Sequence, residues 1–305
     1  MFRRRLRIAT LGIAALTTLA TLALAPAVSA TFPDRNGLLA FQAETDDGVQ
    51  IFTVRPNGHD LRQVTHVDGD ASQPDWSPDG KRIAFAINEC STAVVDADGG
   101  NLTVIASDPD LCQGDPSYAP DGSRIYYERF DFTTFVQGVW SMRPDGSDKT
   151  FVSAAGGPDP NISPSGHLLS VKNVTDGALV VQNLDGSGLI QVSPSVSVAY
   201  KHDWAPDGRR IVLSDNSEPG PNDPVNIATV RPDGTDFRYL THYTGPIHAF
   251  VGSYSPDGQW IVFRLEKDGL NTLYRIRPDG SDLHAILAAS TFRPRNIDWG
   301  PAADR

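Results

Sequence analysis

Short stretches of alternating apolar and polar residues run along the chain after residue 30, and each is bounded by glycine, proline or aspartate. Ile83, Phe85 and Ile87 form one such alternation, directly after the turn-like sequence Pro78-Asp79-Gly80. A period of two is typical of a β-strand with one buried face, and the flanking residues favour tight turns. We find no helical periodicity of useful length beyond residue 30. The pattern therefore predicts an all-β fold of short strands.

The sequence PDWSPDGKRIAFAI (74–87) is one of five complete copies of a repeated motif. Successive copies are 42, 44, 42 and 50 residues apart, counted between the turn glycines Gly80, Gly122, Gly166, Gly208 and Gly258. A second motif is interleaved with the first and occurs six times, from IFTVRPNGHDLRQVT (51–65) to LYRIRPDGSDLHAI (273–286). Each unit of roughly forty residues reads as four strands, which is the pattern of a β-propeller blade.

The sixth copy of the first motif is divided between the two ends of the chain. NGLLAF (36–41) resembles its second half, and NIDWGP (296–301) resembles its first half, with Trp299 at the position of Trp76. Joining the two ends completes six units and leaves no unpaired ring end. The sequence therefore predicts one six-bladed β-propeller over residues 31–305, closed by strands from both termini.

The run W-S-P-D-G-x-x-I-x-F (76–85), followed by the second motif, resembles the repeats of the TolB-like β-propeller family. The resemblance covers almost all of residues 31–305. It implies a six-bladed propeller and an exported protein that binds a protein partner of the cell envelope, as the propeller of TolB binds the lipoprotein Pal.

The first thirty residues have the layout of a secretory signal peptide. Four arginines precede an uncharged apolar stretch that ends in Val28-Ser29-Ala30, small residues of the kind that precede a cleavage site. A retained membrane anchor is the alternative, because the stretch is just long enough to span a bilayer. We expect cleavage, a secreted or periplasmic location, and no membrane insertion after cleavage.

Removal of residues 1–30 makes the chain strongly acidic. The segment takes four of the 26 basic residues and none of the 37 acidic ones, which leaves a formal net charge of −15. With no run of basic residues, we expect no binding to nucleic acid. The remaining chain is expected to be a monomer.

The repeated aspartates belong to turns rather than to a catalytic site. Asp79 has equivalents in three other blades, and Ser165 replaces it in a fourth. Aspartate accepts backbone hydrogen bonds in turns, and glycine supplies a positive φ. DADGGN (96–101) resembles the start of a calcium loop, but Ser107 stands at position twelve, where such a loop needs glutamate. A hairpin is the better interpretation there.

Propeller topology places every repeated turn on one face of the ring and every variable loop on the other. Function on repeat scaffolds usually lies with the variable loops. Candidate binding residues on that face are Asp115, Tyr200, His202, His242, Tyr243 and His248. His202 stands where three other blades have a proline. The alternative is that these are ordinary loop residues.

Cys90 and Cys112 fall in adjacent variable connections of the second blade. An exported protein meets an oxidising compartment, so we predict a disulfide between them. Two free thiols or a metal pair are the alternatives.

We find no G-x-S-x-G, H-E-x-x-H or P-loop motif. The sequence therefore favours a binding scaffold for a protein or peptide, without cofactor, metal or catalytic residues. A lyase or hydrolase acting on polysaccharide, with His202, His242 or His248 near a metal or carboxylate, is the alternative function.

Overall fold

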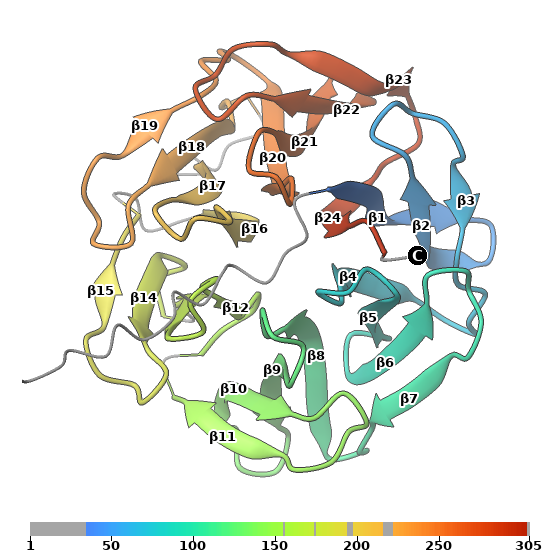
Figure 1. Cartoon of the computed structure of the whole chain (residues 1–305), viewed down its shortest axis with the longest axis vertical. Helices are drawn as coiled ribbons and strands as arrows, with labels where there is room; N and C mark the ends of the chain where they lie inside the picture. The colour runs from blue at the N-terminus through green and yellow to red at the C-terminus, as the bar shows by residue number, and fades with distance from the viewer. Residues whose placement is uncertain (1–34, 155, 174, 194–197, 216–221, 304–305) are drawn as a thin grey trace, which may run out of the picture.

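The computed structural model describes residues 35–154, 156–173, 175–193, 198–215 and 222–303. These residues form 24 strands in six four-stranded antiparallel sheets. The sheets stand around a ring as the blades of a propeller (Figure 1), which confirms the predicted fold class. The predicted signal peptide at residues 1–30 lies outside the described residues. No helix in the described part of the chain is long and apolar enough to cross a membrane.

Each blade has one innermost strand, next to the axis of the ring, and three further strands that follow it outward. The first three blades contain, from the inside outward, β24 (Arg295–Pro301), β1 (Asn36–Thr45), β2 (Gly48–Val54) and β3 (Arg62–Gln63); β4 (Ala71–Trp76), β5 (Arg82–Ile87), β6 (Ser91–Asp96) and β7 (Thr103–Ala106); and β8 (Leu111–Tyr118), β9 (Ile125–Asp131), β10 (Gln137–Met142) and β11 (Thr150–Ser153).

The remaining three blades follow the same order. They contain β12 (Asn161–Ile162), β13 (Leu168–Lys172), β14 (Leu179–Asn183) and β15 (Ile190–Gln191); β16 (Val198–Trp204), β17 (Ile211–Asp215), β18 (Asn226–Val230) and β19 (Arg238–Tyr239); and β20 (Ile247–Tyr254), β21 (Ile261–Lys267), β22 (Leu270–Ile276) and β23 (His284–Ser290).

The first blade is built from both ends of the described chain. Strand β24 pairs with β1, so that Trp299 lies opposite Leu39 and Asp298 lies opposite Ala40. Trp299 is 4% exposed and packs in one apolar cluster with Leu39 and Phe41. The predicted closure of the ring by strands from both termini is therefore confirmed.

The carboxylate of the repeated aspartate accepts hydrogen bonds within the turn between the two inner strands. Asp79 accepts hydrogen bonds from the Ser77 hydroxyl at 2.7 Å and from the backbone N–H of Lys81 at 3.0 Å. Gly80 has a φ of 67°, a left-handed conformation that costs glycine little. In the hairpin at 96–101, Asp98 accepts from the backbone N–H of Gly100 in the same way. The interpretation of these motifs as turns is confirmed.

Candidate binding site at the mouth of the channel

The blades surround a central channel, and the innermost strand of each blade contributes one residue to its lining. This residue stands three positions before the repeated aromatic position of the first motif. In blade order from the second blade, this position holds Gln73, Asp115, Asp159, Lys201, Val251 and Asn296. Four of these residues have a positive φ, 56° at Gln73, 49° at Asp115, 61° at Asp159 and 47° at Asn296. In five of the six blades the pairing of the two inner strands shifts register near this point. A bulge of this kind re-aims a side chain, and here five of the six residues line the narrow part of the channel.

A second position lies on the next strand of each blade, and it contributes Gln42, Glu128 and Arg264 to the lining of the channel mouth. It holds Gln42, Ala86, Glu128, Lys172, Ser214 and Arg264. Gln42 accepts a hydrogen bond from the backbone N–H of Gln73 at 2.8 Å, and the Ser214 hydroxyl accepts one from Val251 N–H at 2.7 Å. Each bond joins a blade to the next blade, so side chains at this position also hold the ring in place.

Residues from these two positions line a cavity of about 600 Å³ on the variable-loop face. We call this cavity the mouth. It is lined mostly by polar and charged side chains, and the charged ones are Glu89, Asp115, Glu128, Lys201, Arg264, Arg293 and Arg295. The acidic residues come from the second and third blades. Arg264 comes from the sixth blade, Arg293 from the connection after β23, and Arg295 is the first residue of β24.

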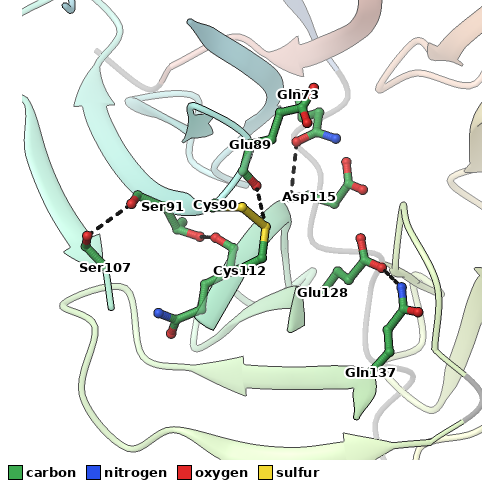
Figure 2. The surroundings of a disulfide bond; sticks show 11 residues. Gln73, Glu89, Cys90, Ser91, Ser107, Cys112, Asp115, Glu128 and Gln137 are labelled. Atoms are coloured by element: carbon green, nitrogen blue, oxygen red, sulfur yellow. Dashed lines mark hydrogen bonds between the residues drawn. A yellow bond between two sulfur atoms is a disulfide. The ribbon is translucent and has the colours of Figure 1, made fainter. Parts of the chain in front are cut away.

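The acidic wall of the mouth consists of Glu89, Asp115 and Glu128 (Figure 2). Burial is the main cause that raises the pKa of Asp115 well above its usual value, followed by the nearby carboxylates of Asp159 and Glu128. Burial also raises the pKa of Glu128, although the Gln137 amide donates a hydrogen bond to it.

A disulfide between Cys90 and Cys112 supports the acidic wall (Figure 2). It joins the loop after β5 to the start of β8, and the backbone N–H of Gln113 donates to the carbonyl of Cys90 at 3.1 Å. A Cβ atom at Gly114 would overlap the carbonyl oxygen of Glu89, so only glycine lets β8 lie this close to the loop. The bridge and the glycine fix the positions of Glu89 and Asp115 at the rim.

The basic wall consists of Arg264, Arg293 and Arg295. The side chain of Arg264 is 4% exposed. Its Nη1 donates to Glu266 Oε2 at 2.6 Å and to Asn271 Oδ1 at 2.5 Å, and its guanidinium lies 4.4 Å from the centre of the Phe250 ring. Arg293 also pairs with Glu266, at 3.2 Å, while Arg295 pairs with the exposed Glu44 at 3.3 Å.

Lys201 forms the floor of the mouth, above a group of four carboxylates. Its Nζ lies 3.8 Å from Asp298 Oδ1, and its side chain is 10% exposed. Burial by itself would lower the pKa of Lys201, but Asp298, Asp159, Asp75 and Asp203 outweigh burial and raise the pKa. One ammonium thus holds four carboxylates together in the channel.

All four of these carboxylates also connect neighbouring blades, and Asp159 does so by accepting a hydrogen bond from the backbone N–H of His202 at 2.8 Å. Asp75 accepts a hydrogen bond from the backbone N–H of Tyr118 at 2.9 Å, Asp203 from Tyr254 at 2.7 Å, and Asp298 from Trp76 at 2.8 Å. In the blades of Asp75, Asp203 and Asp298, the side chain one residue before the aromatic therefore ties the blade to the next blade.

The Asp203 carboxylate makes stability depend on pH. Burial, followed by the charge of Asp298, raises its pKa from 3.8 to about 7. The folded state then holds a proton that the unfolded state releases above pH 4, so the contribution of Asp203 to stability falls as the pH rises from about 4 to about 7. Asp203→Asn keeps an acceptor for Tyr254 N–H and removes the charge.

We expect Asp203→Asn to raise the free energy of unfolding by about 1–3 kcal/mol at pH 8 and to leave it nearly unchanged at pH 4. Urea unfolding of both proteins at the two pH values measures this difference. A variant that is less stable than the parent at pH 8 would contradict the raised pKa.

The structure brings only some of the predicted binding residues to the mouth. Asp115 lines it directly. His248 lies beside the basic wall, because it pairs in register with Glu266 on β21, the residue that Arg264 and Arg293 contact. The His248 Nε2 is 3.0 Å from the carbonyl oxygen of Asp223.

The other predicted residues lie elsewhere. His202 is fully buried, with its Nε2 2.8 Å from the Ser170 hydroxyl and its Nδ1 2.9 Å from Asp159 Oδ2, so its side chain packs between blades and does not face the mouth. His242 is exposed on the loop after β19, and Tyr243 packs against the apolar cluster beside it. The side chain of Tyr200 lies outside the described residues.

Sequence reasoning missed most of the charged residues of the mouth, namely Glu89, Glu128, Lys201, Arg264, Arg293 and Arg295. A signal for three of them was present in the aligned repeats. The two channel positions are polar in five of six blades each, and the residue directly before the second position is apolar or aromatic in every blade. Varied polar residues at a fixed strand position indicate a lined channel.

Within the described ranges, no three His, Cys, Asp or Glu side chains are grouped so as to hold a metal ion. The carboxylates of the channel floor are instead held by Lys201 and by backbone N–H groups.

No model of a protein family matches the sequence. An uncharacterised protein of Agrobacterium fabrum is 26% identical over 66% of this chain and 64% of its own length. The Tol-Pal system protein TolB of Anaeromyxobacter dehalogenans is 31% identical over 36% of this chain. The chain spans 64% of the first of these curated relatives, and the match covers 24% of the second.

Solved structures share the fold at low sequence identity. TolB from Acinetobacter baumannii superposes with a TM-score of 0.70 and 17% identity, covering 87% of this chain and 67% of that one. An oligogalacturonate lyase from Vibrio parahaemolyticus superposes with a TM-score of 0.56 and 15% identity, covering 84% and 76%. The repeats, the six blades and these similarities together show that the chain has a TolB-like six-bladed β-propeller fold.

Proposed function

We propose that this chain is an exported TolB-like propeller that acts as a binding scaffold in the cell envelope or outside the cell, and that it holds a peptide segment of a partner protein at the mouth. The observation that carries the proposal is the mouth itself, an open cavity of about 600 Å³ with charged walls of opposite sign. Sites of this size and polarity suit a short extended segment, since a few placed polar groups fix its orientation.

Exposed aromatic side chains beside the acidic wall add to the proposed binding surface. Phe132 and Phe135 follow β9 and are 48% and 76% exposed. Both rings contact Phe130, with centroids 5.4 Å and 6.3 Å apart. Aromatic residues beside a polar rim are favoured at protein–protein interfaces. A peptide held in the mouth would have these rings within reach of its flanking residues.

The export and the protein partner rest on the likeness to TolB. The relatives that carry the name Tol-Pal system protein support a partner in the envelope. The signal-like segment at residues 1–30 supports transport to the periplasm or the outside.

A lyase or hydrolase acting on polysaccharide receives less support. The fold similarity to oligogalacturonate lyase concerns the propeller alone. The histidines that would carry such a site are separated, because His202 is enclosed between blades while His242 lies on an exposed loop of the fifth blade.

Steric blockade of the mouth tests the proposed function. Peptides are first selected from a displayed random library on the immobilised parent protein, and their affinities are then measured in solution. Arg293→Cys carrying a bulky maleimide adduct fills the mouth, because Arg293 lines it and is 41% exposed. Asp233→Cys with the same adduct is the matched control on the opposite face, where Asp233 is exposed.

We expect the adduct at position 293 to weaken the selected peptides more than tenfold and the adduct at 233 to change their affinity less than twofold. Peptides that bind equally well to the protein blocked at 293 would overturn the proposed function.

A further inference from the structure

The three arginines of the basic wall reach one cavity from neighbouring segments. Arg264 projects from β21 of the sixth blade, while Arg293 and Arg295 lie at the entry into β24. Their guanidinium groups are close enough that the charges of Arg293 and Arg295 lower the pKa of Arg264, after the larger effect of burial, to about 10. Three like charges are therefore held together at a partly enclosed surface.

The cluster has hydrogen-bonding capacity that the protein does not use. The Nε atoms of all three arginines are buried and have no hydrogen-bond partner among the described residues. Arg264 is also fixed in place, since Glu266 and Asn271 hold its Nη1 and Phe250 covers its face. A buried donor without a partner is costly to the fold. The side chains of Arg293 and Arg295 are 41% and 33% exposed, so their outer N–H groups are the ones that a ligand can reach.

The charges within the cluster do not balance. Arg264 and Arg293 share the single carboxylate of Glu266, and Arg295 pairs with Glu44, whose side chain is 66% exposed. An exposed pair of this kind contributes little. Lys201 lines the same cavity, but the carboxylates of the channel floor balance its charge. One positive charge is left over beside the arginines, in a chain that is acidic as a whole.

Resting on the proposed function, we infer that Arg264, Arg293 and Arg295 form the subsite that binds a carboxylate of the peptide held in the mouth. That carboxylate is either an aspartate or glutamate side chain or a free C-terminus. A guanidinium presents two N–H groups in the geometry of a carboxylate, and such pairs are among the stronger hydrogen bonds in proteins. The acidic wall across the mouth repels the same group, so the peptide binds in one direction only.

Two substitutions at the exposed arginines test the inference without disturbing the buried one. Arg293→Gln and Arg295→Gln each remove a charge from residues that are 41% and 33% exposed. Arg277→Gln is the matched control, because Arg277 is equally exposed at 33% and pairs with Asp282 away from the mouth. The probes are the peptides selected on the parent protein, each synthesised with its acidic residues changed to amides and with a free or an amidated C-terminus.

On the parent protein, we expect loss of the recognised carboxylate to weaken binding about tenfold to a hundredfold. The side-chain and C-terminal forms identify which carboxylate is bound. On Arg295→Gln or Arg293→Gln, removal of the same peptide carboxylate is expected to weaken binding much less, because the arginine that binds it is already gone. The Arg277→Gln variant is expected to behave as the parent protein does. This dependence of one loss on the other is the direct sign of contact.

Two results would overturn the inference. One is equal binding of all peptide forms to the parent protein. The other is a carboxylate effect of the same size on the parent and on both mouth variants. In either case the proposed function still stands if the adduct at position 293 abolishes binding, so the two failures are distinguishable.

Trigalacturonate serves as a second carboxylate probe. If it binds in a way that depends on the arginines while no peptide binds, the ligand is not a peptide and the inference is overturned.

Discussion

Replacing Lys201 with methionine is expected to lower the free energy of unfolding by about 3–5 kcal/mol at pH 8. Lys201 is the cation on which Asp75, Asp159, Asp203 and Asp298 all act, and it is 10% exposed. Its removal leaves these carboxylates facing one another across the channel with no opposite charge. Removal of one partner of a buried ion pair is far more costly than replacement of both partners by apolar groups. Chemical denaturation measures the loss.

The loss should depend on pH and on the neighbouring carboxylate. Protonation of the carboxylates removes their repulsion, so the destabilisation by Lys201→Met should shrink as the pH falls toward 4. Adding Asp298→Asn to Lys201→Met should restore part of the stability at pH 8. Lys81→Met is the matched control, since Lys81 is exposed in a turn of the second blade. A loss below about 1 kcal/mol for Lys201→Met would contradict the central role of this ammonium.

Trp299→Ala is the second substitution with a large expected effect, a loss of about 3–5 kcal/mol. Trp299 stands on β24, which supplies the innermost strand of the first blade, and its ring packs with residues of β1 and with Val262 of the sixth blade. The alanine variant leaves a cavity at the point where the ring closes. Thermal or chemical unfolding measures the change, and a single cooperative transition is expected for the parent protein.

Trp204→Ala is the matched comparison for the closure. Trp204 occupies the same position in the fifth blade, where no chain end is involved, and is also 4% exposed. Its indole N–H donates to the Ser170 hydroxyl at 2.8 Å, so this variant should lose slightly more than Trp299→Ala. A loss from Trp299→Ala that is under a third of that from Trp204→Ala would mean that the closure is much looser than the other blade contacts.

The fold follows from the sequence because each blade repeats the same local chemistry. A carboxylate such as Asp79 and a glycine such as Gly80 specify a turn from their own neighbours along the chain, and the alternation after them specifies the strand. The number of copies then specifies the number of blades. The closure also follows from the sequence, because half of a repeat at each end can be recognised when the complete repeat is known.

The mouth could be predicted only in part because residues far apart in the sequence build it. Arg264 and Asp115 face one cavity, but 149 positions separate them in the chain. His202 shows the other difficulty. It follows Lys201 directly, and alternation along β16 sends the Lys201 side chain into the channel and the His202 side chain between blades. The position of His202 in the repeat does not reveal which way its side chain points.

A second cavity makes the choice of face testable. It has a volume of about 940 Å³ and lies on the face of the repeated turns, between the fifth and sixth blades. Its lining repeats the same kinds of turn residue and includes the prolines of four turns. Arg209 and Asp233 also line it, and both are exposed. We assign binding to the mouth because the mouth differs from blade to blade, whereas the turn face does not.

Amide hydrogen exchange of the parent protein, with and without a selected peptide, tests this assignment most directly. Binding at the mouth predicts slower exchange in segments 111–115 and 293–297, which line it, and unchanged exchange in segments 206–210 and 231–234 on the turn face. Slower exchange confined to 206–210 and 231–234, with 111–115 and 293–297 unchanged, would contradict the account.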